Sequence, residues 1–267
     1  MCEPVISLEN VDLIYAGRSR PVQALEKVSL TAARGEFVSI VGPSGCGKST
    51  LLKIVSGLIP ACAGQVMVNG RQVHGPQPSV GIVFQSPLLM PWRTILDNVL
   101  VQIDMRGLPV AKYRDKARHL LAMVGLSAFE DAHPYQLSGG MQQRVGICRA
   151  LVHAPQLLIM DEPFGALDAM TREQMMVELQ RIWMEQRTTI LFITHSLSEA
   201  IFLSDRVLVM GPRPGHVVGA FTIDITRPRR IRDERSPAFA AYAEQIRGCL
   251  EANGALPSVP GDPALNS

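Results

Sequence analysis

The sequence predicts an α/β fold in which a mostly parallel sheet with helices follows antiparallel N-terminal strands and carries an inserted helical subdomain. Three observations predict it. β-branched and polar residues alternate over residues 4–40, which is typical of strands. Short apolar runs later alternate with segments of helical periodicity, as in parallel α/β cores. From about residue 87 to 150 strand signals vanish and helical periodicity takes over, which indicates the inserted subdomain.

The first part of the chain should supply most of the strands. We expect three strands within residues 4–40, antiparallel at first, and the third (36–41) runs into a glycine-rich loop. A helical pattern over 48–58 follows that loop, so strand, loop and helix form one α/β unit. Two further short strands are predicted over 64–73 and 80–84.

The remaining elements follow in a simple order. Helices are predicted over 94–106, 110–124 and 140–153, then strands over 157–160, 189–194 and 207–210, with helices over 171–186 and 197–203 between the strands. This gives a main domain over 1–226 with the subdomain inserted, and a C-terminal extension over 227–267. The extension opens with RPRRIRDERS (227–236) and continues as a helix over 238–251. We expect the basic stretch to be a solvated charged surface; the alternative is a surface that faces anionic lipid headgroups. We expect the Pro/Gly/Ala-rich tail of the extension to be disordered.

Bulk properties limit the function classes. The chain has 267 residues, 47% hydrophobic and 19% charged, which predicts a compact globular protein. A net charge of +2 is too weak to indicate a nucleic-acid partner. Apolar runs fall well short of the ~20 residues of a membrane span, and the N-terminus shows no signal-peptide pattern. Five scattered cysteines suggest reduced thiols in a cytosol rather than a disulfide framework.

The glycine-rich segment GPSGCGKST (42–50) fits the phosphate-loop pattern G-x-x-x-x-G-K-[ST] without a gap. Its glycines let successive backbone N–H groups point inward at a polyphosphate, and the following helix adds the positive end of its dipole. Lys48 would reach the β- and γ-phosphates, and the Ser49 hydroxyl would bind Mg²⁺. The segment therefore predicts a MgATP site. Its expected contacts are Gly42, Pro43, Ser44, Gly45, Cys46, Gly47, Lys48, Ser49 and Thr50, with no chemical role for Cys46.

Acidic residues end the apolar run LLIMDEP (157–163), where a buried strand carries them to the ligand-binding edge of the sheet. We expect Asp161 to hold Mg²⁺, directly or through water, and Glu162 to polarise the water that attacks the γ-phosphate. His195 follows TILFIT at the same edge, where a neutral imidazole would contact the γ-phosphate and orient the water. Taken alone, each of these features also fits a purely structural role.

A second anion-binding pattern lies in LSGGMQQR (137–144), which places Ser138, Gly139 and Gly140 at a helix start. One chain already has a complete phosphate loop, so this second site has no obvious ligand of its own. A head-to-tail pair of chains with two-fold symmetry, each completing the ATP site of the other, resolves this. An ordinary capped helix with a glycine turn is the alternative.

Taken in order, these motifs resemble the ATP-binding subunit of ABC transporters over residues 5 to about 225, and LSGG is the discriminating element. The resemblance implies that Tyr15 stacks on adenine, with a core tyrosine as the alternative. It also implies that Gln85 joins Mg²⁺ and the water to the helical subdomain, and that Asp168 lies in a loop crossing the dimer interface. This chain has Met141 at a position where many members of the family have glutamine.

The segments QSPLLMPWRTILDNV (85–99) and FGALDAMTRE (164–173) look like the importers of nitrate, sulfonate, taurine and related small organic anions. This likeness implies a membrane permease as partner, an external solute-binding protein acting indirectly, no nucleic acid, and a peripheral place on the cytoplasmic face of the inner membrane. In the family this region receives a permease helix, so Trp92 is either an anchor for it or a core residue. The permease is also an alternative to lipid headgroups as the partner that the basic stretch (227–236) faces.

Two rival functions stay open on the sequence. One is an ABC ATPase acting on nucleic acid or protein assemblies, although neither long coiled coils nor a second ATPase domain is seen. The other is an exporter ATPase with the same chemistry, against which the 85–99 segment favours import. Met170, Met175 and Met176 recur at helical spacing and are expected to pack rather than bind a cofactor.

Overall fold

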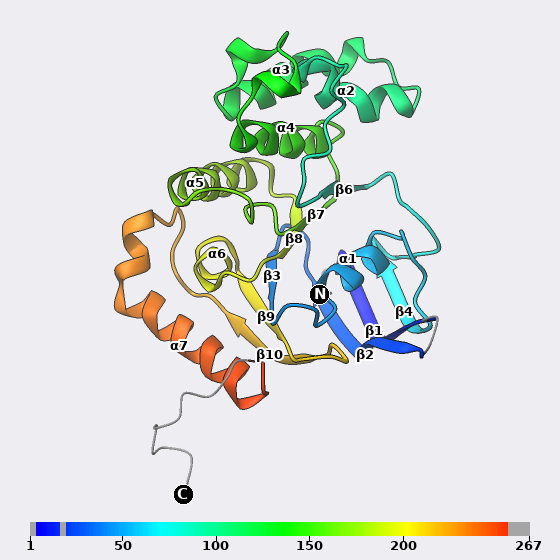
Figure 1. The fold of residues 1–267 in the computed structure, drawn as a ribbon, viewed down its shortest axis with the longest axis vertical. Helices are drawn as coiled ribbons and strands as arrows, with labels where there is room; N and C mark the ends of the chain where they lie inside the picture. Colours follow the sequence, from blue (N-terminus) through cyan, green and yellow to red (C-terminus); the bar gives the residue numbers. More distant parts are fainter. Residues whose placement is uncertain (1–3, 17–19, 256–267) are drawn as a thin grey trace, which may run out of the picture.

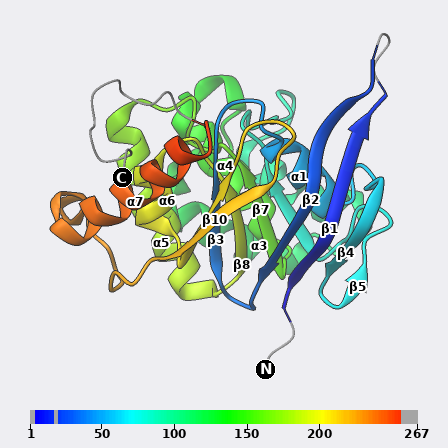
Figure 2. The same cartoon turned by 90° about the horizontal axis from the view of Figure 1, so that it is seen from below.

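The computed structural model describes residues 4–16 and 20–255, which form two sheets and the helices around them (Figures 1 and 2). The strands are β1 (Ile6–Tyr15), β2 (Val22–Ala32), β3 (Phe37–Val41), β4 (Ala63–Val68), β5 (Arg71–Gln72), β6 (Val80–Val83), β7 (Leu157–Asp161), β8 (Thr189–Ile193), β9 (Arg206–Met210) and β10 (Val217–Thr222). The helices are α1 (Lys48–Val55), α2 (Ile95–Met105), α3 (Ala111–Met123), η1 (Ser127–Phe129), η2 (Pro134–Gln136), α4 (Gly139–Leu151), α5 (Ala169–Gln186), α6 (Leu197–Leu203), η3 (Ile231–Arg235) and α7 (Pro237–Ala252).

The six-stranded sheet has the order β10-β9-β3-β8-β7-β6 and is parallel except at β10. Every residue of β3 and β8 is buried, as expected for parallel strands covered on both faces. The predicted parallel core is confirmed. Since the carboxyl ends of β3, β6, β7, β8 and β9 meet at one edge, the loops that follow these strands converge there. The edge strand β10 is an element that the sequence analysis missed.

The N-terminal strands build a separate four-stranded antiparallel sheet of order β2-β1-β4-β5, whose strands lie side by side at the right of Figure 2. The predicted single strand over 64–73 is wrong. It is two short strands, β4 and β5, joined at Asn69 and Gly70, whose φ angles are both positive (52° and 70°). That backbone is the one a tight hairpin turn needs, and Asn-Gly is its preferred sequence.

Three α-helices and two short 3-10 helices inserted between β6 and β7 form the predicted helical subdomain, which stands at one end of the molecule in Figure 1. Helices α2, α3 and α4 contribute to one apolar core, with Val99, Leu121 and Val145 fully buried. The entry to α2 is fixed by the buried Asn98, whose Oδ1 accepts from Met90 N at 2.7 Å and whose Nδ2 donates to Met90 O at 3.1 Å.

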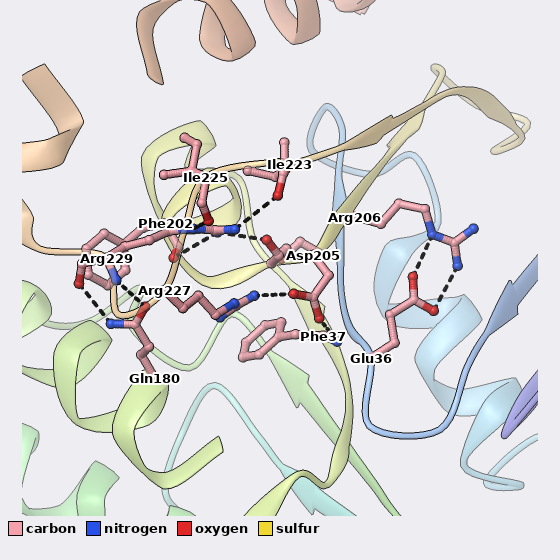
Figure 3. Close-up of polar contacts among 12 residues, drawn as sticks. Glu36, Phe37, Gln180, Phe202, Asp205, Arg206, Ile223, Ile225, Arg227 and Arg229 are labelled. Carbon is pink, nitrogen blue, oxygen red and sulfur yellow. Dashed lines mark hydrogen bonds and ion pairs between the residues drawn. The ribbon is translucent and has the colours of Figure 1, made fainter. Parts of the chain in front are cut away.

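The basic segment after β10 is built into the main domain, so the expectation of a solvated charged surface is wrong for two of its residues. Arg229 is 3% exposed and donates hydrogen bonds to carbonyls of Phe202 and Ser204 at 3.1 and 2.7 Å, at the end of α6 (Figure 3). Arg227 pairs with Asp205 at 2.8 Å. The physical reason is that a helix end leaves carbonyl groups without partners, and the Arg229 guanidinium supplies donors for them.

The same segment is fixed to α5 from the other side. Backbone atoms of Arg229 exchange two hydrogen bonds with the Gln180 amide, at 2.8 and 2.9 Å, and the Arg227 guanidinium lies 4.2 Å from the Trp183 ring centre. Burial, followed by the charge of Arg227, lowers the pKa of Arg229 to about 10, so the guanidinium stays charged at neutral pH. Helix α7 follows and confirms the predicted C-terminal helix, while the predicted disordered tail lies largely in 256–267, outside the described residues.

We expect Arg229→Met to lower the free energy of unfolding by about 2–4 kcal/mol, because several buried carbonyl groups lose their donor together. Denaturant unfolding measures this change. Arg232→Met serves as the matched control, because Arg232 is an exposed arginine of the same segment. Equal stability of the two variants would show that the buried guanidinium contributes no net stabilisation.

The expected packing of the three methionines holds for two of them. Met175 and Met176 are 1% and 2% exposed on the inner face of α5, whereas Met170 in its first turn is 75% exposed. The first turn of α5 projects beyond the core, so helical spacing alone misplaced Met170.

Candidate functional site

The phosphate loop joins β3 to α1 in a conformation that requires glycine. Gly45 and Gly47 have φ angles of 76° and 108°, in the left-handed region. A Cβ atom on Gly47 would lie 2.7 Å from Leu25 Cδ2 and 2.8 Å from Ala24 O. The loop is therefore wedged against β2, and its backbone curls as the motif predicts.

Lys48 begins α1 and is 6% exposed. Its ammonium group donates to the carbonyl oxygens of Gly42 and Pro43, both at 2.9 Å, so the lysine lies folded along the loop. Cys46 is 1% exposed beneath the loop, and burial raises the pKa of its thiol. Both facts make Cys46 a packing residue, in keeping with the absence of any predicted chemical role.

A cavity of about 460 Å³ lies over this loop. Its lining is Tyr15, Val22, Ala24, Ser44, Gly45, Gly47, Lys48, Ser49, Thr50, Glu162 and Arg213. The Tyr15 ring, 41% exposed, forms part of this wall, and its hydroxyl lies 3.2 Å from Thr50 Oγ1. Tyr15 thus lies beside the phosphate loop, not in the core.

The acidic pair stands at the carboxyl end of β7. Asp161 Oδ1 accepts a hydrogen bond from Ser49 Oγ at 3.1 Å, which brings the two expected metal ligands together. Burial raises the pKa of Asp161, and the neighbouring Glu162 carboxylate adds to the rise. A nearby cation would favour the ionised carboxylate.

Glu162 has a left-handed backbone with φ 44°, which is uncommon for a residue with a side chain. Its N–H donates to Ile193 O at 2.9 Å, and its carbonyl accepts from Gly165 N at 3.1 Å, so contacts on both sides hold this conformation. Its Oε2 lies 3.3 Å from Nδ1 of His195, which follows the adjacent strand β8. Backbone strain of this kind is concentrated at functional sites.

The second anion-binding pattern does not reach the cavity of its own chain. Ser138 caps α4, with its Oγ accepting from Met141 N at 3.3 Å, but it does not line the cavity, and neither do Gly139 and Gly140. A Cβ on Gly140 would lie 2.6 Å from Thr171 Cγ2, so the fold itself requires that glycine. A Cβ on Gly139 would meet no described atom within 4 Å.

The two remaining predicted residues lie outside the cavity. Gln85 is exposed in the loop after β6. If Gly165 carried a Cβ atom, that atom would lie 3.5 Å from Gln85 Nε2, so the Gln85 side chain lies near the Glu162 turn. Asp168 caps α5: its carboxylate accepts from Thr171 N at 3.0 Å and Thr171 Oγ1 at 2.6 Å, and these bonds lower its pKa.

Three residues of the cavity wall were not predicted from the sequence: the apolar Val22 and Ala24, and the charged Arg213. Arg213 follows β9, and its Nε and Nη2 both contact Gly45 O, at 3.2 and 3.1 Å. Its sequence context, GPRPG, gives only a turn signal. Only the position of β9 beside β3 in the sheet brings this turn to the phosphate loop.

A second cavity, of about 340 Å³, lies between the main sheet and the helical subdomain. Its lining is Ser56, Pro76, Gln77, Val80, Ile82, Phe84, Leu88, Met90, Val101, Gln102, Met105, Arg106 and Arg149. Leu88 and Met105 are 64% and 77% exposed at its rim, and Trp92, two residues beyond Met90, is 74% exposed. The core alternative for Trp92 is therefore wrong. Among the residues that the structure describes, no helix has the length and apolarity that crossing a membrane requires.

Known proteins are similar to this chain over most of its length. Residues 25–165 match the family described as ABC transporter. An uncharacterized ABC transporter ATP-binding protein of Methanocaldococcus jannaschii is 45% identical, over 92% of this chain and 91% of that protein. The taurine import ATP-binding protein TauB of Rhizobium johnstonii is 44% identical, over 95% and 99%. A solved dimeric ATP-binding cassette in a post-hydrolysis state, bound to ADP and Pi, has a TM-score of 0.72 and 33% identity, covering 83% of this chain and 100% of that one.

Proposed function

This chain belongs to the ABC transporter family of ATP-hydrolysing subunits, and we propose that it drives the import of a small organic anion through a separate membrane permease. The single observation that carries the proposal is the convergence of Lys48, Ser49, Asp161, Glu162 and His195 at one sheet edge around the phosphate-loop cavity. The solute class rests on the likeness to a taurine import protein.

Nucleotide binding is assigned to the cavity residues. The inward N–H groups of the loop and the start of α1 take the phosphates, and Lys48 exchanges its two carbonyl acceptors for the more strongly accepting oxygens of the β- and γ-phosphates. Tyr15 lies at the wall where the adenine ring would stack on it.

Ser49 and Asp161, joined at 3.1 Å, fit magnesium, since they offer hydroxyl and carboxylate oxygens, the ligands a hard cation prefers. Gln85, near the Glu162 turn, would add an amide oxygen. These residues would hold the ion, and the ion would offset charge that develops on the phosphates. ATP turnover by the purified chain should therefore stop when EDTA is added and return with excess Mg²⁺. Turnover that persists in EDTA would contradict this assignment.

Hydrolysis is assigned to Glu162 and His195. The Glu162 carboxylate orients and polarises the attacking water, and its left-handed backbone fixes where that carboxylate points. His195 Nδ1 lies 3.3 Å from Glu162 Oε2, where an Nδ1–H donates to the carboxylate and leaves Nε2 as an acceptor for the water. The contact with the γ-phosphate would use the other tautomer, in which Nε2–H donates to a phosphate oxygen. As in phosphoryl transfer generally, the rate gain comes mainly from positioning and charge stabilisation.

Ser138, Gly139 and Gly140 are assigned to the nucleotide of a second copy. In one chain they lie outside the cavity, yet they form a capped helix start with bare backbone donors. A head-to-tail dimer places each such helix start against the phosphates held by the partner, with Asp168 in the loop between the copies. A dimeric arrangement is seen in the similar solved cassette.

Substitutions at Gly139 and Gly140 distinguish a role in binding the partner's nucleotide from a purely structural role. We expect Gly139→Ala to leave the free energy of unfolding within about 0.5 kcal/mol of wild type, because its methyl group meets open space. The same variant should reduce ATP turnover at least about tenfold, because the methyl group blocks the approach of the partner's phosphate to the backbone donors. ATPase rates and denaturant unfolding measure the two effects.

Gly140→Ala is the comparison variant, expected to lose about 1–3 kcal/mol of stability through its clash with Thr171. Full turnover in Gly139→Ala would contradict the composite site.

The cavity between sheet and subdomain is assigned to the permease. Exposed apolar residues gather at its rim, and Trp92 stands out from the same segment. Large exposed aromatic residues supply much of the binding energy of protein interfaces. Movement of the subdomain on ATP-driven closure would reach the permease here. The chain then acts peripherally, at the cytoplasmic face of the inner membrane, with a solute-binding protein outside the cell and without nucleic acid.

A further inference from the structure

We propose that Arg213 is a second cation of the nucleotide site, which binds the phosphate chain of ATP alongside Lys48. This inference rests on the proposed function and extends it to a residue that none of the motifs contains. Arg213 lies in the loop after β9, and its guanidinium group contacts the phosphate loop at Gly45 O.

The loop between β9 and β10 is attached to the phosphate loop, not free in solvent. Gly215 N donates to Ala24 O at 2.9 Å, and its carbonyl accepts from Glu26 N at 3.0 Å, so the loop pairs with β2 through both backbone groups of Gly215. A Cβ on Gly215 would lie only 1.9 Å from Cys46 O. The two loops are therefore in direct backbone contact, which fixes the position of the loop that carries the exposed Arg213.

Arg213 extends from this fixed loop to the tip of the phosphate loop. Its Nε and Nη2 share the carbonyl oxygen of Gly45, the residue with φ 76°. Gly45 O is its only hydrogen-bond acceptor among the described residues, and a guanidinium carries five N–H donors. Arg213 also lines the cavity over the phosphate loop, together with Lys48 and Ser49.

The charges of the cavity favour a polyanion at this point. Among the lining residues Lys48 and Arg213 are the cations, and Glu162 is the single carboxylate. Lys48 reaches the phosphates from within the loop, while Arg213 approaches from the outer side of the loop tip. A planar guanidinium matches phosphate oxygens in pairs, and a phosphate oxygen is a stronger acceptor than the Gly45 carbonyl.

A residue that binds the phosphates contributes equally to the binding of ATP and GTP, whereas a residue that binds the base distinguishes adenine from guanine. We expect Arg213→Gln to raise the dissociation constants of MgATP and MgGTP by the same factor, about tenfold or more. Arg213→Lys, which keeps the charge but not the planar fork, should cause a smaller loss. Titration calorimetry on the full chain measures these constants, and melting of the nucleotide-free protein checks that both variants fold.

Two further variants make the result decisive. Arg247→Gln, an exposed arginine of α7, should bind both nucleotides like wild type, and Lys48→Ala should lose affinity for both. Arg213→Gln with wild-type ATP affinity, while Lys48→Ala has lost it, would overturn the Arg213 assignment and leave the phosphate loop intact. Loss confined to one nucleotide would assign Arg213 to the base and overturn the phosphate role. A wild-type chain that bound no nucleotide would instead overturn the proposed function.

Discussion

Glu162→Gln is expected to reduce ATP turnover about 100-fold or more while leaving ATP binding intact. The glutamine keeps the size of the side chain but cannot accept a proton or polarise water as a carboxylate does, and general acid–base contributions of this kind are about 10²–10⁴-fold. Because binding persists and hydrolysis does not, the ATP-bound head-to-tail dimer should accumulate. Phosphate release measures the first effect, and sedimentation with ATP and with ADP measures the second.

The matched control is Glu244→Gln, an exposed carboxylate on α7, which should turn over ATP like wild type. Normal turnover in Glu162→Gln would remove Glu162 from the chemistry. Lost turnover without an ATP-dependent dimer would contradict the composite site, even if the carboxylate were essential.

Lys48→Ala is expected to weaken MgATP binding by about 10- to 100-fold, because hydrogen bonds to charged groups contribute about 1.5–3 kcal/mol each. The ammonium group already lies inside the loop, bound to Gly42 O and Pro43 O, so it needs only a short movement to reach a phosphate. Equilibrium binding of a fluorescent ATP analogue, competed with ATP, measures the loss.

Lys53→Ala, an exposed lysine of the same helix α1, should bind ATP within about threefold of wild type, as an exposed charge away from the ligand does. Unchanged ATP affinity in Lys48→Ala would contradict the assignment of the phosphate loop.

The sequence predicted those parts of the fold in which local pattern and tertiary structure agree. The third predicted strand and the loop after it became β3 and the glycine turn, because a buried strand and left-handed glycines each leave a local signal. Helix α2 begins at Ile95, directly after its cap Thr94, where the sequence predicted its start. Helix α5 begins at Ala169 after its cap Asp168, two residues before the predicted start at 171.

The errors at Arg229 and Arg213 depend on contacts between distant segments. Arg229 reads as one more charge in a basic run, and only the nearby end of α6 explains its burial. β10 is an edge strand with mixed burial, so its pattern is weak. Arg213 reaches the site because β9 pairs with β3, although the two are far apart in the sequence. Local patterns carry no information about such pairings.

The central claim is that this ATPase serves a membrane permease, and purification of the tagged chain from native membranes in mild detergent tests it most directly. Mass spectrometry should identify a multi-span membrane protein with wild type and much less of it with Trp92→Ala, because Trp92 is 74% exposed beside the predicted docking cavity. The control Tyr135→Ala, at an equally exposed aromatic residue near α4, should retain the permease. A soluble nucleoprotein partner with no membrane protein would contradict the importer assignment, although the ATPase chemistry would stand.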